Sequence, residues 1–448
     1  MKRRSKIPVL SELIARESGN LIEIMQKAIP EALRMDRYLG WQELRHRAAP
    51  EGMTIEQWWL GIKLHRTQAR QSVSLCNAKG QAFEFAPTQY IQQSLHKIDR
   101  AAGTLLMTDA NAVLNVTERD KYLLTSLAEE AIMSSMLEGA VVTRSEARDL
   151  IRNNRLPKDE HEQMVMNNYR TMRMILQHKD EPLTPDFILS LHRSMVEGTL
   201  KHPEKAGTLR QAEDKVYIED TRTGDVIHMP PSAESLPERL EAICRFANAE
   251  DSKEYYIHPV IRAILLHFQL AYDHPFVDGN GRTARSLFYW GMLHAGYWLF
   301  EYISISREIY RHSRSYYESF INTEEDDNDL NYFIINQLKT IYESIESLNK
   351  HLIAKQNMQE KLQHSLSNIS HLNHRQKNVL LHFLRHPNDC TSVSLHCNEY
   401  QVVRQTARTD LAGLVNLGFL TTELVSREFI YKPIPHLEQH LNNLIDLK

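Results

Sequence analysis

The residues best suited to chemistry form one run, His274–Arg285, with the sequence HPFVDGNGRTAR. Gly279 and Gly281 permit positive φ angles and leave backbone N–H groups uncovered where the next helix begins. Helix N-termini attract anions, and Arg282 and Arg285 stand one helical turn apart just inside this one. Because cations there oppose the helix dipole, the pattern predicts a bound anion with several negative charges, best a polyphosphate.

Two further side chains of this run suit phosphate chemistry. Asp278 offers a carboxylate for Mg²⁺, which needs only one or two protein carboxylates when phosphates complete its shell. His274 carries a group whose ordinary pKa is near neutrality, as a general base requires. The alternative is a plain glycine-rich helix cap with solvated arginines, and the six features together favour the polyphosphate site.

Helices are predicted on both sides of this run. Apolar residues at helical spacing predict one helix that ends near Asp273 and a second that ends near His294. Further helices are predicted over residues 117–138, 145–153, 160–178, 185–198 and 236–248. The acidic cluster 324–329 is expected to be a solvated loop.

Two short β-hairpins are predicted within this helical pattern. Val216, Tyr217 and Ile218 face residues 226–228 across a turn signal, which predicts one hairpin. The second is predicted over residues 72–85, around an Asn-Ala-Lys-Gly turn.

Composition bounds the class of protein. The chain has 448 residues with only 16 glycines and 16 prolines, which favours a mainly α fold of two or three domains. A net charge of −4 excludes a polycation that coats nucleic acid. Four cysteines make no disulfide scaffold, and no apolar run reaches the length of a membrane span, so a cytoplasmic protein without membrane association is expected.

The run HPFVDGNGRTAR resembles the signature of the Fic family, H-x-F-x-[D/E]-G-N-G-R-x-x-R, at every fixed position. The similarity extends over about residues 117–345 and includes Gly207-x-x-Arg210 and His258-Pro259. It implies an all-helical core with the hairpin at 216–228 as a flap. It also implies transfer of AMP from ATP, with Mg²⁺, to a protein hydroxyl.

The resemblance implies a role for each residue of the signature. His274 would accept the proton of a Ser, Thr or Tyr hydroxyl of the target, and Asp278 would hold Mg²⁺. Phe276 would anchor the loop in the core. The remaining residues would bind the phosphates of the donor: Gly279, Asn280 and Gly281 the α-phosphate, Arg282 the β-phosphate and Arg285 the γ-phosphate.

Two binding surfaces are also implied by the resemblance. The first strand of the flap would pair with the backbone of the target and present its hydroxyl. The adenine would lie near His312, where several relatives have asparagine, with Tyr316 and Tyr317 closing over the base. A core role for one of the two tyrosines is the alternative.

A second family motif, [S/T]-x-x-x-E-[G/N], matches Ser134 to Gly139 at the end of the predicted helix 117–138. A carboxylate at that helix end opposes the dipole and favours a cationic partner, although an exposed, frayed glutamate is the alternative. The resemblance implies that Glu138 pairs with Arg285, blocks the γ-phosphate and inhibits transfer. In some relatives this glutamate also positions water for removing AMP, so de-AMPylation remains open.

The chain is predicted to have four parts: a helical N-terminal region 1–115, a Fic domain with its inhibitory helix 116–350, a helical linker 351–372 and a C-terminal domain 373–448. The last resembles winged helix-turn-helix domains, with a recognition helix around 405–411 and a wing at 424–431. Its nearly balanced charge leaves DNA binding, protein docking and homodimer formation open. Its histidines and cysteines lack paired zinc-ligand spacing.

The expected function is therefore an autoinhibited protein adenylyltransferase that uses ATP and Mg²⁺ and modifies a protein target, with itself as a further target. One alternative transfers another phosphate-containing group through the same loop. Another is a transcriptional or docking regulator with a winged helix, whose Fic core senses a nucleotide and turns it over little.

Overall fold

The computed structural model describes residues 5–34, 38–107, 116–219, 224, 226–249, 256–367, 372–385, 389–425, 428–437 and 440–441. Contacts group the chain into two compact units, Met1–Leu348 and Asn349–Lys448. The described residues form many helices and three small sheets, so the mainly α prediction is confirmed. No described helix combines the length and apolarity needed to cross a bilayer.

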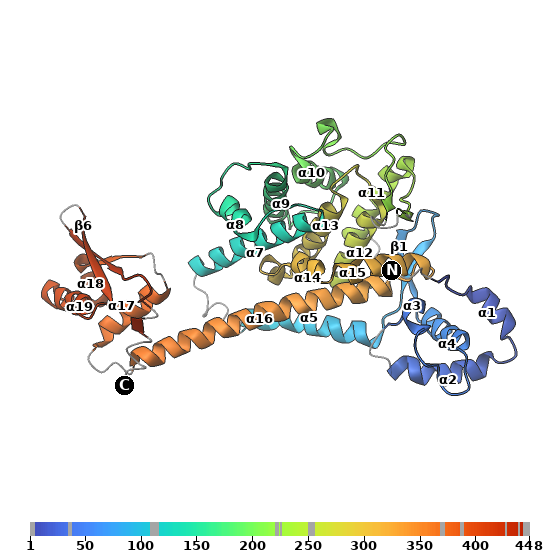
Figure 1. The fold of residues 1–448 in the computed structure, drawn as a ribbon, viewed down its shortest axis with the longest axis horizontal. Helices are drawn as coiled ribbons and strands as arrows, with labels where there is room; N and C mark the ends of the chain where they lie inside the picture. The colour runs from blue at the N-terminus through green and yellow to red at the C-terminus, as the bar shows by residue number, and fades with distance from the viewer. Residues whose placement is uncertain are drawn as a thin grey trace. The chain divides into compact units, whose positions relative to one another are not determined.

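Two helices form the centre of the first unit: α12 (Pro259–Asp273) and α13 (Asn280–His294) pack along each other (Figure 1). Nearly every residue of both helices is buried. Surrounding helices are α7 (Val116–Leu137), α8 (Arg144–Arg152), α9 (Glu160–Gln177), α10 (Pro185–Val196), α11 (Leu236–Ala247), α14 (Ile305–Arg311) and α15 (Ser313–Glu325). Short 3₁₀ turns are η1 (Pro203–Lys205), η2 (Ala233–Ser235) and η3 (Trp298–Glu301).

Local sequence explains where several of these helices begin. The Thr143 side chain accepts the Glu146 N–H while the glutamate bonds back, which is a capping box at α8. Asp159 and Thr184 cap α9 and α10 in the same position. Proline at the first position of α12 suits a helix start because its missing N–H would have no intrahelical partner.

The N-terminal region belongs to the first unit. It contains α1 (Leu10–Arg16), α2 (Leu21–Arg34), α3 (Trp41–Leu44), α4 (Ile55–Gln68), β1 (Gln71–Cys76), β2 (Ala82–Phe85) and α5 (Gln89–Met107). Trp41, Trp58 and Trp59 are buried in its apolar cluster. β1 and β2 pair antiparallel, as the hairpin prediction over 72–85 requires.

The acidic stretch that begins in the last turn of α15 is only in part the solvated loop expected from its composition, since Glu325 and Asp327 are exposed while two other members are not. Asp326 and Asp329 are buried, with side chains 2% and 0% exposed. Lys63 Nζ lies 2.6 Å from Asp326 Oδ1, and an Arg70 nitrogen lies 2.5 Å from Asp329 Oδ2. The prediction was wrong for Asp326 and Asp329 because their cations come from the N-terminal region, more than two hundred residues away in sequence, and buried charges require such partners.

The flap is a two-stranded antiparallel sheet of β3 (Ile218–Glu219) and β4 (Val226–His228). Ile218 pairs with His228, while Val216 and Tyr217 precede the strand. The predicted first strand is therefore displaced toward the turn. Residues 220–223 and 225 of that turn lie outside the described residues.

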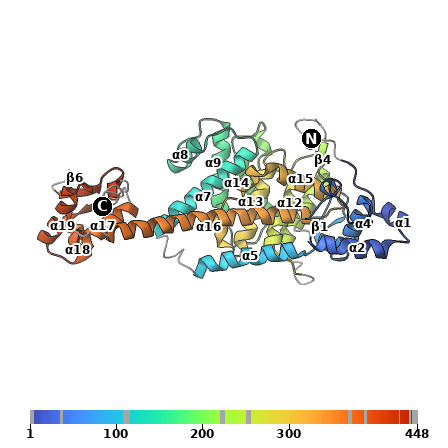
Figure 2. The same cartoon turned by 60° about the horizontal axis from the view of Figure 1, so that its bottom comes forward.

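The second unit begins within α16 (Asn331–Ser367), which makes residues 351–367 of the predicted linker helical. It continues with α17 (His374–Arg385), β5 (Thr391–Ser392), α18 (Val393–Tyr400), α19 (Arg404–Asn416), β6 (Leu420–Val425) and β7 (Glu428–Pro433). The three strands form one sheet in the order β5-β7-β6. Figure 2 shows β6 in the same unit as α17, α18 and α19. Leu380, Phe383, Leu411 and Leu414 lie in its own apolar core.

Candidate active site

Backbone contacts hold the signature loop at the end of α12. His274 follows the helix in a left-handed conformation, with φ of 47°. Its carbonyl accepts a 2.9 Å bond from Arg210 Nε, and the Arg210 N–H donates to Pro275 O at 2.9 Å. A terminal nitrogen of the same arginine donates to Pro231 O. Arg210 therefore holds two backbone carbonyls of the loop and ties them to the backbone at Pro231.

The side-chain contacts of His274 define which ring nitrogen is basic. Nδ1 lies 3.1 Å from the carbonyl oxygen of Ala271. Because a carbonyl can only accept, Nδ1 carries the proton and Nε2 keeps its lone pair. Burial lowers the pKa of His274 below its ordinary value. The imidazole is consequently neutral at pH 7 and able to accept a proton at Nε2.

Asn280 shapes the interior of the loop. Its Oδ1 accepts the Phe276 N–H at 2.9 Å, and its Nδ2 donates to the Phe276 carbonyl at 2.8 Å. Phe276 is fully buried, in the anchoring position that the sequence suggests. Both ends of the asparagine amide are thus used inside the loop, which leaves backbone N–H groups to face an anion.

His192, on α10, supports the loop from behind and was not among the predicted site residues. Its ring stacks on Phe276 with centroids 3.7 Å apart and planes within 3°. Nε2 donates to the Asp278 carbonyl at 2.9 Å, and Nδ1 accepts the Gly207 N–H at 3.0 Å. Burial lowers the pKa of His192 to about 4. Both bonds require this neutral tautomer, and only the fold brings the residue here.

Gly279 occupies a position that no other residue would fill. Its φ is 79°, and a Cβ there would lie 2.6 Å from Val196 Cγ1. The α13 helix starts at the next residue, so the first N–H groups of this helix have no intrahelical partners. The expected anion site at a helix N-terminus is therefore present in the fold.

Arg282 and Asp278 lie side by side at the mouth of the loop. The arginine is buried, with one terminal nitrogen 3.2 Å from Met195 O and the other 3.2 Å from Asp278 Oδ2. Arg282 Nε is buried without a partner among the described residues, which suits a bound anion. The Asp278 side chain is 58% exposed, so its single hard oxygen donor fits Mg²⁺ that is shared with phosphates.

Arg285 is turned toward the end of α7. Nε donates to Ser134 Oγ at 2.9 Å, and a terminal nitrogen donates to Ser134 O at 3.0 Å and to Glu138 Oε1 at 2.9 Å. The guanidinium is buried, whereas the Glu138 side chain is 30% exposed. The two predicted partners, Glu138 and Arg285, are thus brought together.

The Glu138 carboxylate also lies against the first turn of α13. A Cβ on Gly281 would stand 3.0 Å from Glu138 Cδ and 3.2 Å from an Arg285 terminal nitrogen. A negative group therefore already occupies the space beside Gly281, where the helix N-terminus attracts anions. This glycine leaves room for the carboxylate.

A second carboxylate of α7, Glu130, anchors that helix and was also missed from the sequence. It is 2% exposed and accepts bonds from Tyr289 Oη at 2.8 Å, Ser304 Oγ at 2.8 Å and the Ser306 N–H at 3.0 Å, with Ser306 Oγ as a fourth donor. Four donors compensate a buried charge without a direct ion pair. They join α7 to α13 and to the start of α14.

The three residues expected near an adenine lie in different environments. Tyr316 is buried, and its hydroxyl lies 2.9 Å from His267 Nε2 in the aromatic core. Tyr317 is 50% exposed. The His312 side chain is 55% exposed and stands 3.7 Å from Glu343. Tyr316 is buried as the alternative core role requires, and a position near a base stays a prediction for all three residues.

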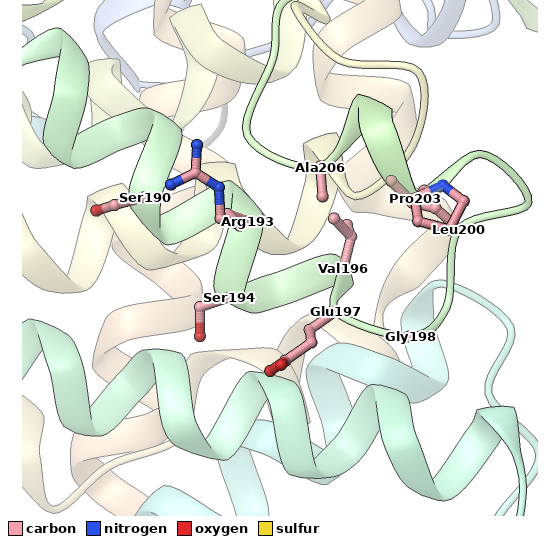
Figure 3. A pocket seen from close by; sticks show the side chains of 9 residues that line it. All are labelled: Ser190, Arg193, Ser194, Val196, Glu197, Gly198, Leu200, Pro203 and Ala206. Carbon is pink, nitrogen blue, oxygen red and sulfur yellow. The ribbon is translucent and has the colours of Figure 1, made fainter.

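A cavity of about 380 Å³ lies between α10 and the loop after it. Its lining residues are Ser190, Arg193, Ser194, Val196, Glu197, Gly198, Leu200, Pro203 and Ala206 (Figure 3). None of them was predicted to bind the donor. Val196 also faces Gly279, so the cavity and the signature loop share this side chain.

Comparison with known proteins shows which proteins this chain is similar to. Residues 182–291 match the Fic/DOC family. A protein named Protein adenylyltransferase Fic from Nematostella vectensis is 28% identical over 216 residues, which cover 47% of this chain and 46% of that protein. A protein of the same name from Drosophila grimshawi is 30% identical over 198 residues, covering 42% of this chain and 36% of that one.

The matched segments span less than half the length of these curated relatives. Among solved structures, Fic-1 from C. elegans has a TM-score of 0.50 at 19% identity, covering 78% of this chain and 90% of that chain. At this identity the likeness concerns the fold alone.

Proposed function

We propose that this chain is a protein adenylyltransferase that transfers AMP from ATP to a hydroxyl of a protein target, because residues 182–291 match the Fic/DOC family. The observation that carries the proposal is the geometry at the start of α13. There an anion-binding helix N-terminus, a buried Arg282 with an unpartnered Nε and a neutral His274 meet in one loop.

In the proposed reaction, His274 Nε2 takes the proton of a Ser, Thr or Tyr hydroxyl as its oxygen attacks the α-phosphorus. The bond from that phosphorus to the bridging oxygen breaks, and pyrophosphate leaves. The N–H groups of Gly279 and Gly281 stabilise charge on the α-phosphate. Arg282 binds the β-phosphate and Arg285 the γ-phosphate. Asp278 would hold Mg²⁺, which neutralises phosphate charge when bound.

We further propose that Glu138 inhibits this reaction. A γ-phosphate needs Arg285, whose Nε and one terminal nitrogen are engaged by Ser134 and Glu138. The carboxylate also lies beside Gly281, so its charge repels a phosphate there. ATP would then bind with its α-phosphate out of line, and a displacement of about 1 Å can slow a reaction about 10²-fold.

The target is proposed to dock on the flap near Val216, Tyr217 and Ile218. β3 pairs with β4 on one edge only, which leaves the other edge for the backbone of a target. Tyr217 and Val226 are 45% and 51% exposed, so side chains on the flap are available for contact.

The same glutamate supports a second candidate activity, removal of AMP. Its carboxylate is partly exposed and stands beside the anion site, where a base could activate water. Incubation of AMP-labelled protein with wild-type enzyme and Mg²⁺ tests this, since release of AMP by wild type and not by Glu138→Gly is expected.

We infer that the second unit is a winged helix. The order helix, strand, two helices and hairpin supports this inference, as does the exposure of Arg404, Gln405, Arg408 and Thr409 on α19. DNA binding and docking to protein, including a second copy, are both compatible with that surface. Filter binding of duplex DNA over a range of salt concentrations separates them, because phosphate contacts weaken steeply with salt.

Labelling with radioactive ATP tests the main proposal. Glu138→Gly protein should acquire label from ATP carrying the isotope at the α-phosphate and none from ATP labelled at the γ-phosphate. The double variant with His274→Ala should acquire neither. Equal labelling from both nucleotides would indicate transfer of another group, and no labelling of any protein in a lysate would contradict the proposal.

A further inference from the structure

His228, the last residue of β4, connects the flap to two helices of the core. Its side chain is 5% exposed. Nδ1 lies 2.8 Å from Glu324 Oε2 on α15, and Nε2 lies 2.7 Å from the backbone carbonyl of Tyr272 on α12. The ring also packs against the Tyr272 ring, with centroids 4.6 Å apart.

Both hydrogen-bond partners of this imidazole can only accept. A carboxylate and a carbonyl have no proton to give, and a neutral imidazole has one N–H. The two bonds can therefore exist together only when both ring nitrogens carry protons. The contacts define His228 as an imidazolium, with Glu324 as its counter-ion.

The charges on the neighbouring elements agree with this assignment. Asp273 on α12 is buried and bonded to Arg239 on α11 at 2.6 Å and to Gln269 at 2.9 Å, so its charge is compensated by another cation. His274 is neutral, as its bond to a carbonyl and its lowered pKa indicate. The charge of Glu324 is thus left for His228, whose Nδ1 lies 2.8 Å from Glu324 Oε2.

We propose that His228 is a positioning residue whose protonated ring holds the flap at a fixed distance from His274. His228 pairs directly with Ile218 of β3, and its anchor on Tyr272 lies two residues before the general base. Loss of the proton leaves one nitrogen facing an acceptor, which releases β4. The inference rests on the proposed docking of the target on the flap, and it concerns target binding and not ATP.

The first test is spectroscopic and requires no enzymatic activity. Wild-type protein labelled with ¹⁵N-histidine is compared with His228→Asn protein at pH 7 to assign the ring signals. Both nitrogens of His228 should give the signature of a protonated ring, and Glu324→Gln should shift them toward the neutral form. An unprotonated nitrogen in the wild-type ring would overturn the proposal.

The second test measures self-labelling with ATP in the Glu138→Gly background. His228→Asn and Glu324→Gln should each lower the rate on the order of tenfold, because small displacements slow transfer strongly. The double variant should be no slower than either single variant.

Controls separate positioning from unfolding. The affinity for a non-hydrolysable ATP analogue should stay within about twofold of the parent. The melting temperature should stay within a few degrees of the parent. His178→Asn removes an exposed histidine that lies 3.0 Å from Glu181, and it should leave the rate unchanged. Unchanged rates for both His228→Asn and Glu324→Gln, or loss of ATP affinity in them, would overturn the proposal. If the parent transfers no AMP, the proposed function fails while the spectrum still decides the state of His228.

Discussion

The two sides of the α13 N-terminus are held in different ways. On the loop side, Phe276, Asn280 and His192 are buried and joined by neutral hydrogen bonds and stacking. On the opposite side, a buried Arg285 meets a partly exposed Glu138 at the end of a helix. Gly139 follows with φ of 90°, and a Cβ added there would have no neighbouring heavy atom within 4 Å. The loop side is enclosed, whereas the Glu138 side chain is 30% exposed at a helix end.

Breaking the loop side should give the largest effect. Asn280→Ala removes both bonds to Phe276 and leaves a buried N–H and carbonyl unpaired, which costs about 1–3 kcal/mol for each group. AMP transfer in the Glu138→Gly background should fall on the order of 10³-fold, measured by α-phosphate labelling. Asn336→Ala removes an exposed asparagine bond as a control. A fall of less than tenfold would show that the loop keeps its shape without the amide.

The second largest effect is expected from acid, which should lower the free energy of unfolding through His192 on the loop side. Unfolded histidine binds a proton near pH 6.5, while burial lowers the pKa of His192 to about 4. As pH falls from 6.5 to 4, the proton favours the unfolded chain, so the contribution of His192 to stability falls by about 3 kcal/mol, and this contribution is constant above pH 6.5. Urea unfolding at a series of pH values measures this. His192→Gln should be less stable at pH 7 and have a flatter acid slope, whereas Glu138→Gly should keep the wild-type slope.

Removing the glutamate should raise activity with little change in stability. Glu138→Gly should increase AMP transfer on the order of tenfold or more, because Arg285 and the space beside Gly281 become available to phosphate. Glu138→Gln keeps the shape of the side chain without its charge, so its rate of AMP transfer should lie between those of wild type and Glu138→Gly. Glu181→Gly is the matched exposed control. Equal rates for wild type and Glu138→Gly would contradict the inhibitory role.

The smallest effect is expected at the other end of the contact between α7 and the core. Glu130→Gln keeps the volume and removes the buried charge that four donors compensate. Looser attachment of α7 should raise basal AMP transfer by about threefold. Breaking a buried hydrogen-bond network shifts the equilibrium between attached and detached α7 by about 1 kcal/mol. Labelling and thermal melting together test it. A lower melting temperature with unchanged transfer would show that Glu130 supports the fold alone.

The signature could be found from the sequence because its residues lie within twelve positions on one loop and helix. Glu138 could be found as well, since it ends a helix with regular apolar spacing. His192 and Glu130 could not, because an isolated histidine or glutamate in a helix has no local pattern that separates it from a surface residue. Their bonds join segments 86 and 174 positions apart, which only packing defines.

The same limit explains the acidic stretch and Asn280. Charge density alone favoured a solvated loop for Asp326 and Asp329, while the compensating lysine and arginine lie far upstream. The resemblance gave Asn280 a phosphate-binding role, yet its amide is spent on the Phe276 backbone. The local sequence predicts which residue types are present in a segment. The role of each side chain depends on partners that only the folded structure brings near.

The ion pairs of Lys63 and Arg70 also bear on where the molecule can be cut. Removal of residues 1–86 would also remove Lys63 and Arg70, the cations that pair with Asp326 and Asp329. Two carboxylates would then remain in a dry interior without partners. A shortened chain that retains every residue of the signature would therefore carry a destabilised core. The minimal folding unit is larger than the catalytic unit, and it starts before α4.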